Sequence, residues 1–171
     1  KRSADKKKLY LMFDQMYYTL TYGATRHYNP VPLRPEIKNY TVFIHGISKA
    51  FAATGVRVGW AAGPDFIINK MRGFLTHIGA WAPMAEQKAV AAYLPQTECI
   101  QKYMTNFKAE LEKRLHTVYE GFILLKNKGF NVDAIAPQAA IYLTVKIDLC
   151  GKTVAGKILE TQADVTDYIL S

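Results

Sequence analysis

The sequence predicts an α/β fold in which helices cover a mixed, mainly parallel sheet. Three short, continuous apolar runs, at residues 9–13, 41–44 and 57–62, predict strands. Such runs are typical of strands buried on both faces of a parallel sheet, so we expect the first strand to be buried. After residue 64 the apolar residues recur every three or four positions, which predicts helices for the following part of the chain.

The segments between and after these strands follow in order. Residues 21–39 hold three prolines and one glycine, which predict a loop. Residues 64–76 and 83–94 each begin with a proline, a residue suited to the first turn of a helix. The strongest helical pattern runs over residues 100–125, and Gly129 is a suitable C-terminal stop.

The end of the chain is expected to hold a strand over residues 139–147 and a final helix from about Lys152. A periodic helix as long as the one before Gly129 is more typical of a connection between two domains than of the interior of one. The chain would open on a buried strand and close inside an amphipathic helix. Because domain ends usually lie in exposed polar segments, we expect an incomplete part of a longer protein.

Composition and charge restrict the class of protein. Half of the 171 residues are hydrophobic and 21% are charged, which is typical of a folded globular chain. The net charge is +8, and the basic residues 1–8 are interpreted as a solvated lead-in rather than a nucleic-acid or membrane site.

Cysteines, histidines and apolar stretches exclude several further classes. Cys99 and Cys150 form no Cys-x-x-Cys pair, which excludes a disulfide framework and fits a reducing compartment. The four histidines are scattered, so no metal site is expected. No apolar stretch reaches the ~18 residues of a membrane span, and we expect a soluble, cytoplasmic protein.

The most informative segment places Lys49 in a glycine-containing turn between two predicted strands. A lysine held against walls of low dielectric constant has a lowered pKa and can form a Schiff base. Arg57 opens the next strand, where its guanidinium could bind a phosphate through two hydrogen bonds. Alone, Lys49 would more often be a surface lysine, and its combination with Arg57 favours a chemical role.

Asp14 and Tyr17 add two groups at the carboxyl end of the first predicted strand, where open α/β sheets bind ligands. An aspartate can keep a pyridine nitrogen protonated, and a phenol can donate to a phenolate oxygen. An amine, an arginine, a carboxylate and a phenol are the groups that pyridoxal phosphate requires. The alternatives are that Asp14 caps a nearby amide and that Tyr18 or Tyr22 takes the place of Tyr17.

Two short motifs carry a resemblance to a known family: Asp14-Gln-Met-Tyr17 and Ser48-Lys49-x7-Arg57-x-Gly59. Together they resemble the class I/II, fold type I, pyridoxal-phosphate-dependent aminotransferases, and most closely the aspartate aminotransferase branch. The resemblance covers most of residues 9–95 and, more loosely, the long helix. It implies that residues 1–95 are the C-terminal part of a large cofactor-binding domain. Residues 96–171 would be a linking helix and part of a smaller α/β domain.

The resemblance also implies a role for each matching residue. Lys49 would bind the cofactor as a Schiff base and later move a proton between the substrate Cα and C4′ of the cofactor. Asp14 would pair with the pyridine nitrogen, and Tyr17 would donate to the ring oxygen O3′. Arg57 would bind the phosphate, together with the region of Ser48. The implied reaction is transfer of an amino group from an L-amino acid, aspartate or similar, to a 2-oxo acid, in a homodimer of amino-acid metabolism.

The sequence also departs from the family pattern. Gly46 stands where relatives often have a phosphate-binding serine, so phosphate binding would depend more on Arg57. The Asn-Pro-x-Asn-Pro segment, the glycine-rich cofactor loop and the arginine for the substrate α-carboxylate are missing, so the chain alone is expected to be inactive. The region of Trp81 would contribute either to a dimer-related site or to loop packing.

Two other functions stay open at this point. One is a transcription regulator with an aminotransferase-like sensor domain, although residues 1–8 are too short for a DNA-binding head. The other is a different fold type I enzyme, such as a β-lyase or synthase, because the fold does not determine the reaction.

Overall fold

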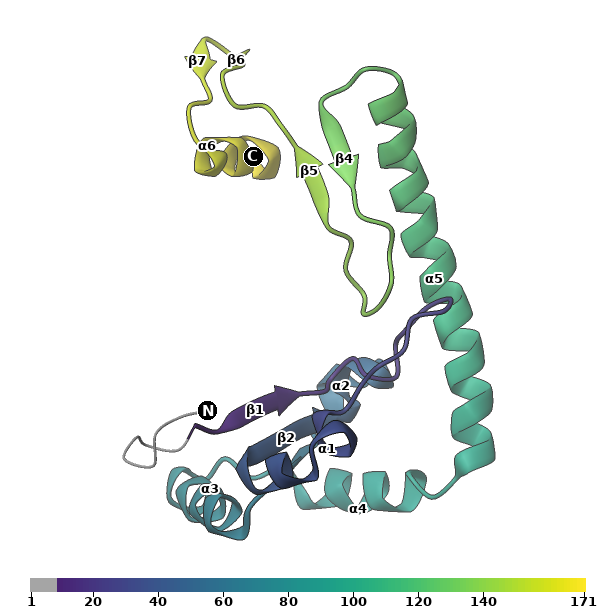
Figure 1. Ribbon diagram of the computed structural model, residues 1–171, viewed down its shortest axis with the longest axis vertical. Helices are drawn as coiled ribbons and strands as arrows, with labels where there is room; N and C mark the ends of the chain where they lie inside the picture. Colours follow the sequence, from purple (N-terminus) through teal and green to yellow (C-terminus); the bar gives the residue numbers. More distant parts are fainter. Residues whose placement is uncertain (1–8) are drawn as a thin grey trace. The chain divides into compact units, whose positions relative to one another are not determined.

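The computed structural model describes residues 9–171, and the lead-in at residues 1–8 lies outside the described part. Contacts between residues divide the chain into two compact units, Lys1–Lys108 and Ala109–Ser171. The helix α5, Thr97–Asn127, runs without interruption through this boundary (Figure 1). The expected boundary between two domains after residue 95 stays a prediction.

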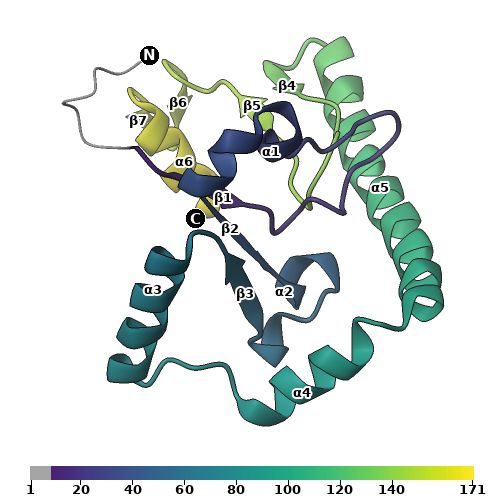
Figure 2. The ribbon, with the colours of Figure 1, turned by 60° about the horizontal axis from the view of Figure 1, so that its bottom comes forward.

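The first unit is built on a three-stranded mixed sheet with the order β1-β2-β3 (Figure 2). The strands are β1, Leu11–Asp14, β2, Thr41–Gly46, and β3, Gly59–Ala62. β1 lies parallel to β2, and β3 lies antiparallel to it. The predicted α/β class and its three strands are confirmed, and the sheet formed by the described residues contains one parallel and one antiparallel pair.

The burial expected for the first strand is wrong for this chain. Leu11 is 41% exposed and Met12 is 72% exposed. Among the described residues β1 pairs with β2 alone, so it is an edge strand and its apolar side chains are left uncovered. The central strand β2 is the buried one, with Thr41 and Val42 both inaccessible or nearly so.

Three helices of the first part of the chain agree with the predicted ranges to within three residues at each end: α3, Asp65–Ile78, α4, Met84–Tyr93, and α5. Four short helical segments were not predicted: α1, Pro30–Leu33, η1, Pro35–Tyr40, α2, Ile47–Ala50, and η2, Thr54–Val56. The first two lie in the expected loop, where the Asn29 side chain accepts a hydrogen bond from the Val31 amide at 2.9 Å and caps α1.

The core of the first unit lies beside α2. Ile47, Val58 and Val90 are buried together, and Phe51 and Val56 pack against them. One residue each from α2, from the position just before β3 and from α4 therefore holds these elements together. This packing fixes the helix that carries Lys49 relative to the sheet.

The second unit begins with the C-terminal part of α5, whose end is as predicted. The amide of Gly129 donates to the Lys126 carbonyl at 2.9 Å, and the amide of Phe130 donates to the Leu125 carbonyl at 3.1 Å. Gly129 has a φ of 89°. This combination is a Schellman motif, which needs a residue in the left-handed region after the helix.

The remaining elements of the second unit are short: β4, Val132–Ala134, β5, Val145–Ile147, β6, Thr153–Val154, β7, Lys157–Ile158, and α6, Gln162–Leu170. β4 pairs with β5 and β6 with β7, both antiparallel. The strand expected over residues 139–147 is wrong in its first half, because Ala140 has a φ of 63° and turns the chain. The final helix begins ten residues later than expected, because residues 152–158 form the β6–β7 hairpin.

Within residues 9–171, none of the helices combines the length and the apolar character that crossing a membrane requires.

Candidate active site

The ends of β1 and β2 bring the first predicted site residues to one edge of the sheet. Asp14 is the last residue of β1 and lies in register with Ile44 of β2. β2 then leads directly into α2, which carries Ser48 and Lys49, so Lys49 lies in a short helix rather than in an open turn. Since both strands are parallel, their carboxyl ends meet where open α/β sheets bind ligands.

The start of β3 returns to this same edge. Gly46 at the end of β2 lies in register with Gly59 at the start of β3. The amide of Ile47 donates to the carbonyl oxygen of Val58 at 3.3 Å, which ties the start of α2 to the residue after Arg57. The strand register and this hydrogen bond therefore bring the chain segments that carry Asp14, Lys49 and Arg57 to one edge of the sheet.

Asp14 takes part in a turn of its own. Its Oδ1 accepts a hydrogen bond from the amide of Met16 at 2.9 Å, and the amide of Gln15 donates to the Ile44 carbonyl at 2.8 Å. This is the amide-capping role that the sequence left open for Asp14. The residue is exposed, and Tyr17 is half-buried in the same turn, where its carbonyl accepts from the Leu20 amide at 2.9 Å.

Arg57 has a strained backbone. Its φ is 59°, in the left-handed region that costs a residue with a side chain ~1 kcal/mol. The strand therefore begins two residues later than predicted, at Gly59. The guanidinium Nη1 donates to the Thr54 carbonyl at 2.8 Å and the residue is otherwise exposed. Strain of this kind is often retained at functional sites.

A hollow of about 360 Å³ lies beside these residues. Its lining includes Ser48 and Arg57, together with Met16, His45 and Trp60. Lys49, Asp14 and Tyr17 do not line it, although all three lie in the described part of the chain. Ser48 and Arg57, the two residues predicted to bind phosphate, therefore line one hollow. Asp14, Tyr17 and Lys49 lie on chain segments that meet at the same edge of the sheet, but they do not line this hollow.

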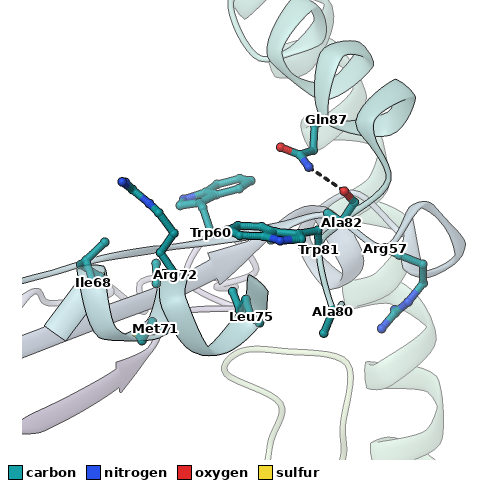
Figure 3. A pocket seen from close by; sticks show the side chains of 12 residues that line it. Arg57, Trp60, Ile68, Met71, Arg72, Leu75, Ala80, Trp81, Ala82 and Gln87 are labelled. Carbon is teal, nitrogen blue, oxygen red and sulfur yellow. Dashed lines mark hydrogen bonds between the residues drawn. The ribbon is translucent and has the colours of Figure 1, made fainter. Parts of the chain in front are cut away.

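A second hollow of about 370 Å³ shares Arg57 and Trp60 with the first (Figure 3). Trp81 and Arg72 also line it, so both tryptophans of the chain line the same hollow as the predicted phosphate-binding arginine. The loop that carries Trp81 is held by Gln87, whose Nε2 donates to the Ala82 carbonyl at 2.6 Å.

The close surroundings of Gly46 explain why this position has no serine side chain. A Cβ atom at this position would lie 2.9 Å from the Val58 carbonyl oxygen and 3.0 Å from Cα of Gly59. Real Cβ atoms essentially never approach so closely. The close contact between β2 and β3 therefore excludes a serine at position 46 unless the backbone shifts.

His45 is a residue of this edge that the sequence analysis missed. Its ring lies edge-to-face against Tyr18 at 4.6 Å and against Trp60 at 5.0 Å, between ring centroids. Its Nδ1 is buried and has no hydrogen-bond partner among the described residues. Burial lowers the pKa of His45, while the backbone of Gln15 and the charge of Asp14 act in the opposite direction. Its position just before Gly46 was the only signal in the sequence.

No group of three or more His, Cys, Asp or Glu side chains suited to a metal ion is found within residues 9–171.

Comparison with known proteins agrees with this arrangement. The sequence model of the family described as aminotransferase class I and II matches residues 2–165. The chain belongs to this family. The similarity of this aminotransferase chain to its relatives extends over both of its units.

Three relatives illustrate the similarity. The chain is 35% identical over 134 residues to an aspartate aminotransferase of Geobacillus stearothermophilus, covering 78% of the chain and 32% of the relative. It is 28% identical over 172 residues to a probable aspartate/prephenate aminotransferase of Rhizobium leguminosarum bv. phaseoli, covering 95% and 40%. The crystal structure of the Rhizobium meliloti aspartate aminotransferase matches with a TM-score of 0.77 and 28% identity, over 94% of this chain and 39% of that one. The chain thus spans 32% to 40% of the length of these relatives.

Proposed function

We propose that this aminotransferase chain is part of a pyridoxal-phosphate-dependent enzyme that transfers an amino group from an L-amino acid to a 2-oxo acid. The observation that carries the proposal is the meeting of the segments that bear Asp14, Lys49 and Arg57 at one edge of the sheet. The printed names of the relatives, which include aspartate and aspartate/prephenate aminotransferases, favour aspartate or a similar amino donor.

The residues of this edge fit pyridoxal phosphate. The cofactor has an aldehyde, a basic ring nitrogen, a phenolic oxygen and a phosphate, and the edge offers an amine, a carboxylate, a phenol and a guanidinium. Ser48 and Arg57 share a hollow with room for a phosphate group. Gly46, which has no side chain, replaces the serine of relatives, so Arg57 carries more of the phosphate binding.

When bound, pyridoxal phosphate supplies a ring that withdraws electrons from the substrate Cα. Lys49 would hold the aldehyde through Nζ, and its amine would accept and return the Cα proton as a general base and acid. The negative charge of Asp14 favours the protonated ring nitrogen. Tyr17 would donate a hydrogen bond to the phenolic oxygen, and the Arg57 guanidinium would bind the phosphate through charge-assisted hydrogen bonds.

The proposal includes three further properties. The enzyme is a homodimer, and residues 1–95 and 96–171 belong to its large and small domains. It is cytoplasmic, which suits the free and exposed thiols of Cys99 and Cys150.

Amino transfer by the protein expressed from its complete reading frame tests this function. With L-aspartate and a 2-oxo acid, we expect pyridoxal-phosphate-dependent formation of the new amino acid. Lys49→Ala is expected to lower the rate by a factor of ~10² to 10⁴ because it removes the proton-transferring group. Lys70→Ala, a change at an exposed lysine of α3, is the matched control and should leave the rate unchanged.

An unchanged rate in Lys49→Ala would contradict the proposal. Pyridoxal-phosphate binding at Lys49 with elimination products and no amino transfer would instead identify a lyase of the same fold.

A further inference from the structure

We infer that Tyr103 of α5 is a positioning residue that fixes the end of the short helix carrying Lys49. This inference rests on the proposed function, because that function gives Lys49 its role in holding the cofactor and moving a proton. Tyr103 itself is not assigned any contact with the cofactor or the substrate. Its hydroxyl acts on the backbone two residues after Lys49, and this backbone determines where the lysine lies.

A single peptide group connects Tyr103 to Lys49. The Tyr103 hydroxyl donates a hydrogen bond to the Phe51 carbonyl at 3.1 Å. The N–H of the same peptide group belongs to Ala52, and it donates to the Lys49 carbonyl at 3.3 Å. Because a peptide group is planar and rigid, fixing its oxygen also fixes the direction of its N–H. The Tyr103 hydroxyl therefore orients the donor that holds the Lys49 carbonyl.

The backbone at this point is strained. α2 has four residues, and a helix of this length is not stable on its own. Ala52, two residues after its end, has a φ of 51°, in the left-handed region that is unfavourable for a residue with a side chain. Such a backbone persists only where the surrounding structure fixes it. The hydrogen bond from Tyr103 lies on the peptide group directly before Ala52, where this restraint is required.

The two ends of α2 are held in different ways. At its start, the Ile47 amide donates to the Val58 carbonyl at 3.3 Å, and the Ile47 side chain is buried with Val58 and Val90. Just after its end, Phe51 is only half-buried, and its ring lies edge-to-face against Tyr93 of α4 at 5.9 Å between ring centroids. Packing therefore fixes the start of α2 more firmly than its end.

The space around this end is not filled by side chains. Phe51, Tyr93 and Tyr103 line an apolar hollow of about 310 Å³. The Tyr103 ring stacks on Phe107 of the same helix, with 5.4 Å between ring centroids and 19° between the planes. A phenylalanine at position 103 would keep this stacking, so the hydroxyl is the part of the side chain that acts on α2.

The Tyr103 hydroxyl is a donor at neutral pH. Burial raises its pKa above the ordinary value of 10.0, and Tyr93 acts in the same direction. The hydroxyl therefore keeps its proton over the pH range in which the enzyme would be assayed.

Removal of one oxygen atom tests the inference. Tyr103→Phe keeps the ring and its stacking and removes only the hydrogen bond to Phe51. Tyr28→Phe, at a tyrosine that is 71% exposed, is the matched control. The protein expressed from its complete reading frame is used, and hydrogen exchange of the Ala52 amide is measured without cofactor. The values of kcat and KM for L-aspartate are measured with saturating pyridoxal phosphate.

We expect Tyr103→Phe to accelerate exchange of the Ala52 amide by about twofold to tenfold, the range that one neutral hydrogen bond contributes. The amides of α3 should exchange as in the wild type. The kcat should fall by a similar factor while KM stays unchanged, because Lys49 would move the proton after the substrate is bound. A loss of overall stability would instead accelerate the α3 amides as well. Tyr28→Phe should match the wild type in every measurement.

Three results would overturn the inference alone. They are unchanged exchange of the Ala52 amide in Tyr103→Phe, equal acceleration of the Ala52 and α3 amides, and an unchanged kcat. In each case borohydride reduction of the wild type would still leave a pyridoxyl label on Lys49, and the proposed function would stand. A wild type without that label on Lys49 would overturn both the inference and the proposed function.

Discussion

A side chain at position 46 would meet the backbone of β3, since its Cβ would lie 2.9 Å from the Val58 carbonyl oxygen and 3.0 Å from Cα of Gly59. The sequence showed Gly46 only as a departure from the serine of relatives. The structure gives it a physical cause, which is the close approach of two antiparallel strands at the edge of the proposed site. This single position therefore links strand packing to the way in which the phosphate must be bound.

Gly46→Ser is expected to destabilise the protein. The new side chain has to push β3 away, and overpacking of this kind costs ~1–3 kcal/mol in free energy of unfolding. Urea denaturation followed by circular dichroism measures the change. Gly55→Ser is the matched control, because nothing lies within 4 Å of a Cβ atom there. Equal stability of Gly46→Ser and the wild type would show that β2 and β3 are not in close contact.

Residue types and spacings predicted part of the site, and the fold supplied the rest. Lys49, Arg57 and Asp14 carry chemistry that can be recognised in a sequence, and their segments do meet at one edge of the sheet. His45 carries no such signal, because its contacts depend on the register that places it opposite Trp60. The left-handed backbone conformation of Arg57 could not be predicted either, since a positive φ is uncommon in residues other than glycine.

At the scale of elements, sequence patterns predicted those elements whose structure depends mainly on residues close together in the sequence. The three longer helices follow from apolar periodicity and from Gly129, which depend on neighbouring residues only. The expected strand at residues 139–147 and the expected helix from Lys152 failed for a different reason. Ala140 and Ala155 both adopt a positive φ, so the chain turns at residues that normally favour continuous structure.

The start of α6 is stabilised by a capping box. The Oδ2 of Asp164 accepts hydrogen bonds from the Thr161 hydroxyl at 2.8 Å and from its amide at 2.9 Å, and the Asp164 amide donates back to the hydroxyl at 3.2 Å. These hydrogen bonds favour the charged carboxylate. They lower the pKa of Asp164 from 3.8 to about 2, with a smaller contribution from Lys157.

This pKa predicts how α6 responds to acid. Because the pKa is lower in the folded chain than in the unfolded one, the stabilisation is complete above pH 3.8 and is lost as the pH falls through about 2. Carboxyl-carbon chemical shifts should give a midpoint near 2 for Asp164. Amide exchange at residues 162–165 should accelerate over the same range, and Asp164→Asn should remove this pH dependence. A midpoint at the ordinary value of 3.8 would contradict the capping box.

At the scale of the whole molecule, the first strand of the sheet leaves apolar side chains exposed. β1 is an edge strand among the described residues, and Leu9 just before it and Met12 within it are 67% and 72% exposed. Since the chain spans 32% to 40% of the relatives compared above, we expect the enzyme to require the remainder of that length for activity.

The family and the fold class follow from the whole sequence, whereas the proposed activity depends on one proposed bond at Lys49. The central claim is that Nζ of Lys49 binds the aldehyde of pyridoxal phosphate at the edge where β1, β2 and β3 meet. Lys38, close in sequence, and Lys70 on α3 are the natural competitors, because an exposed lysine can also react with an aldehyde.

Reductive labelling tests this claim most directly. The protein from the complete reading frame is incubated with pyridoxal phosphate, reduced with borohydride to convert the carbon–nitrogen double bond into a stable single bond, digested, and mapped by mass spectrometry. We predict a stoichiometric pyridoxyl label on Lys49 that disappears in Lys49→Ala. A principal label on Lys38, Lys70 or any other lysine would contradict the account.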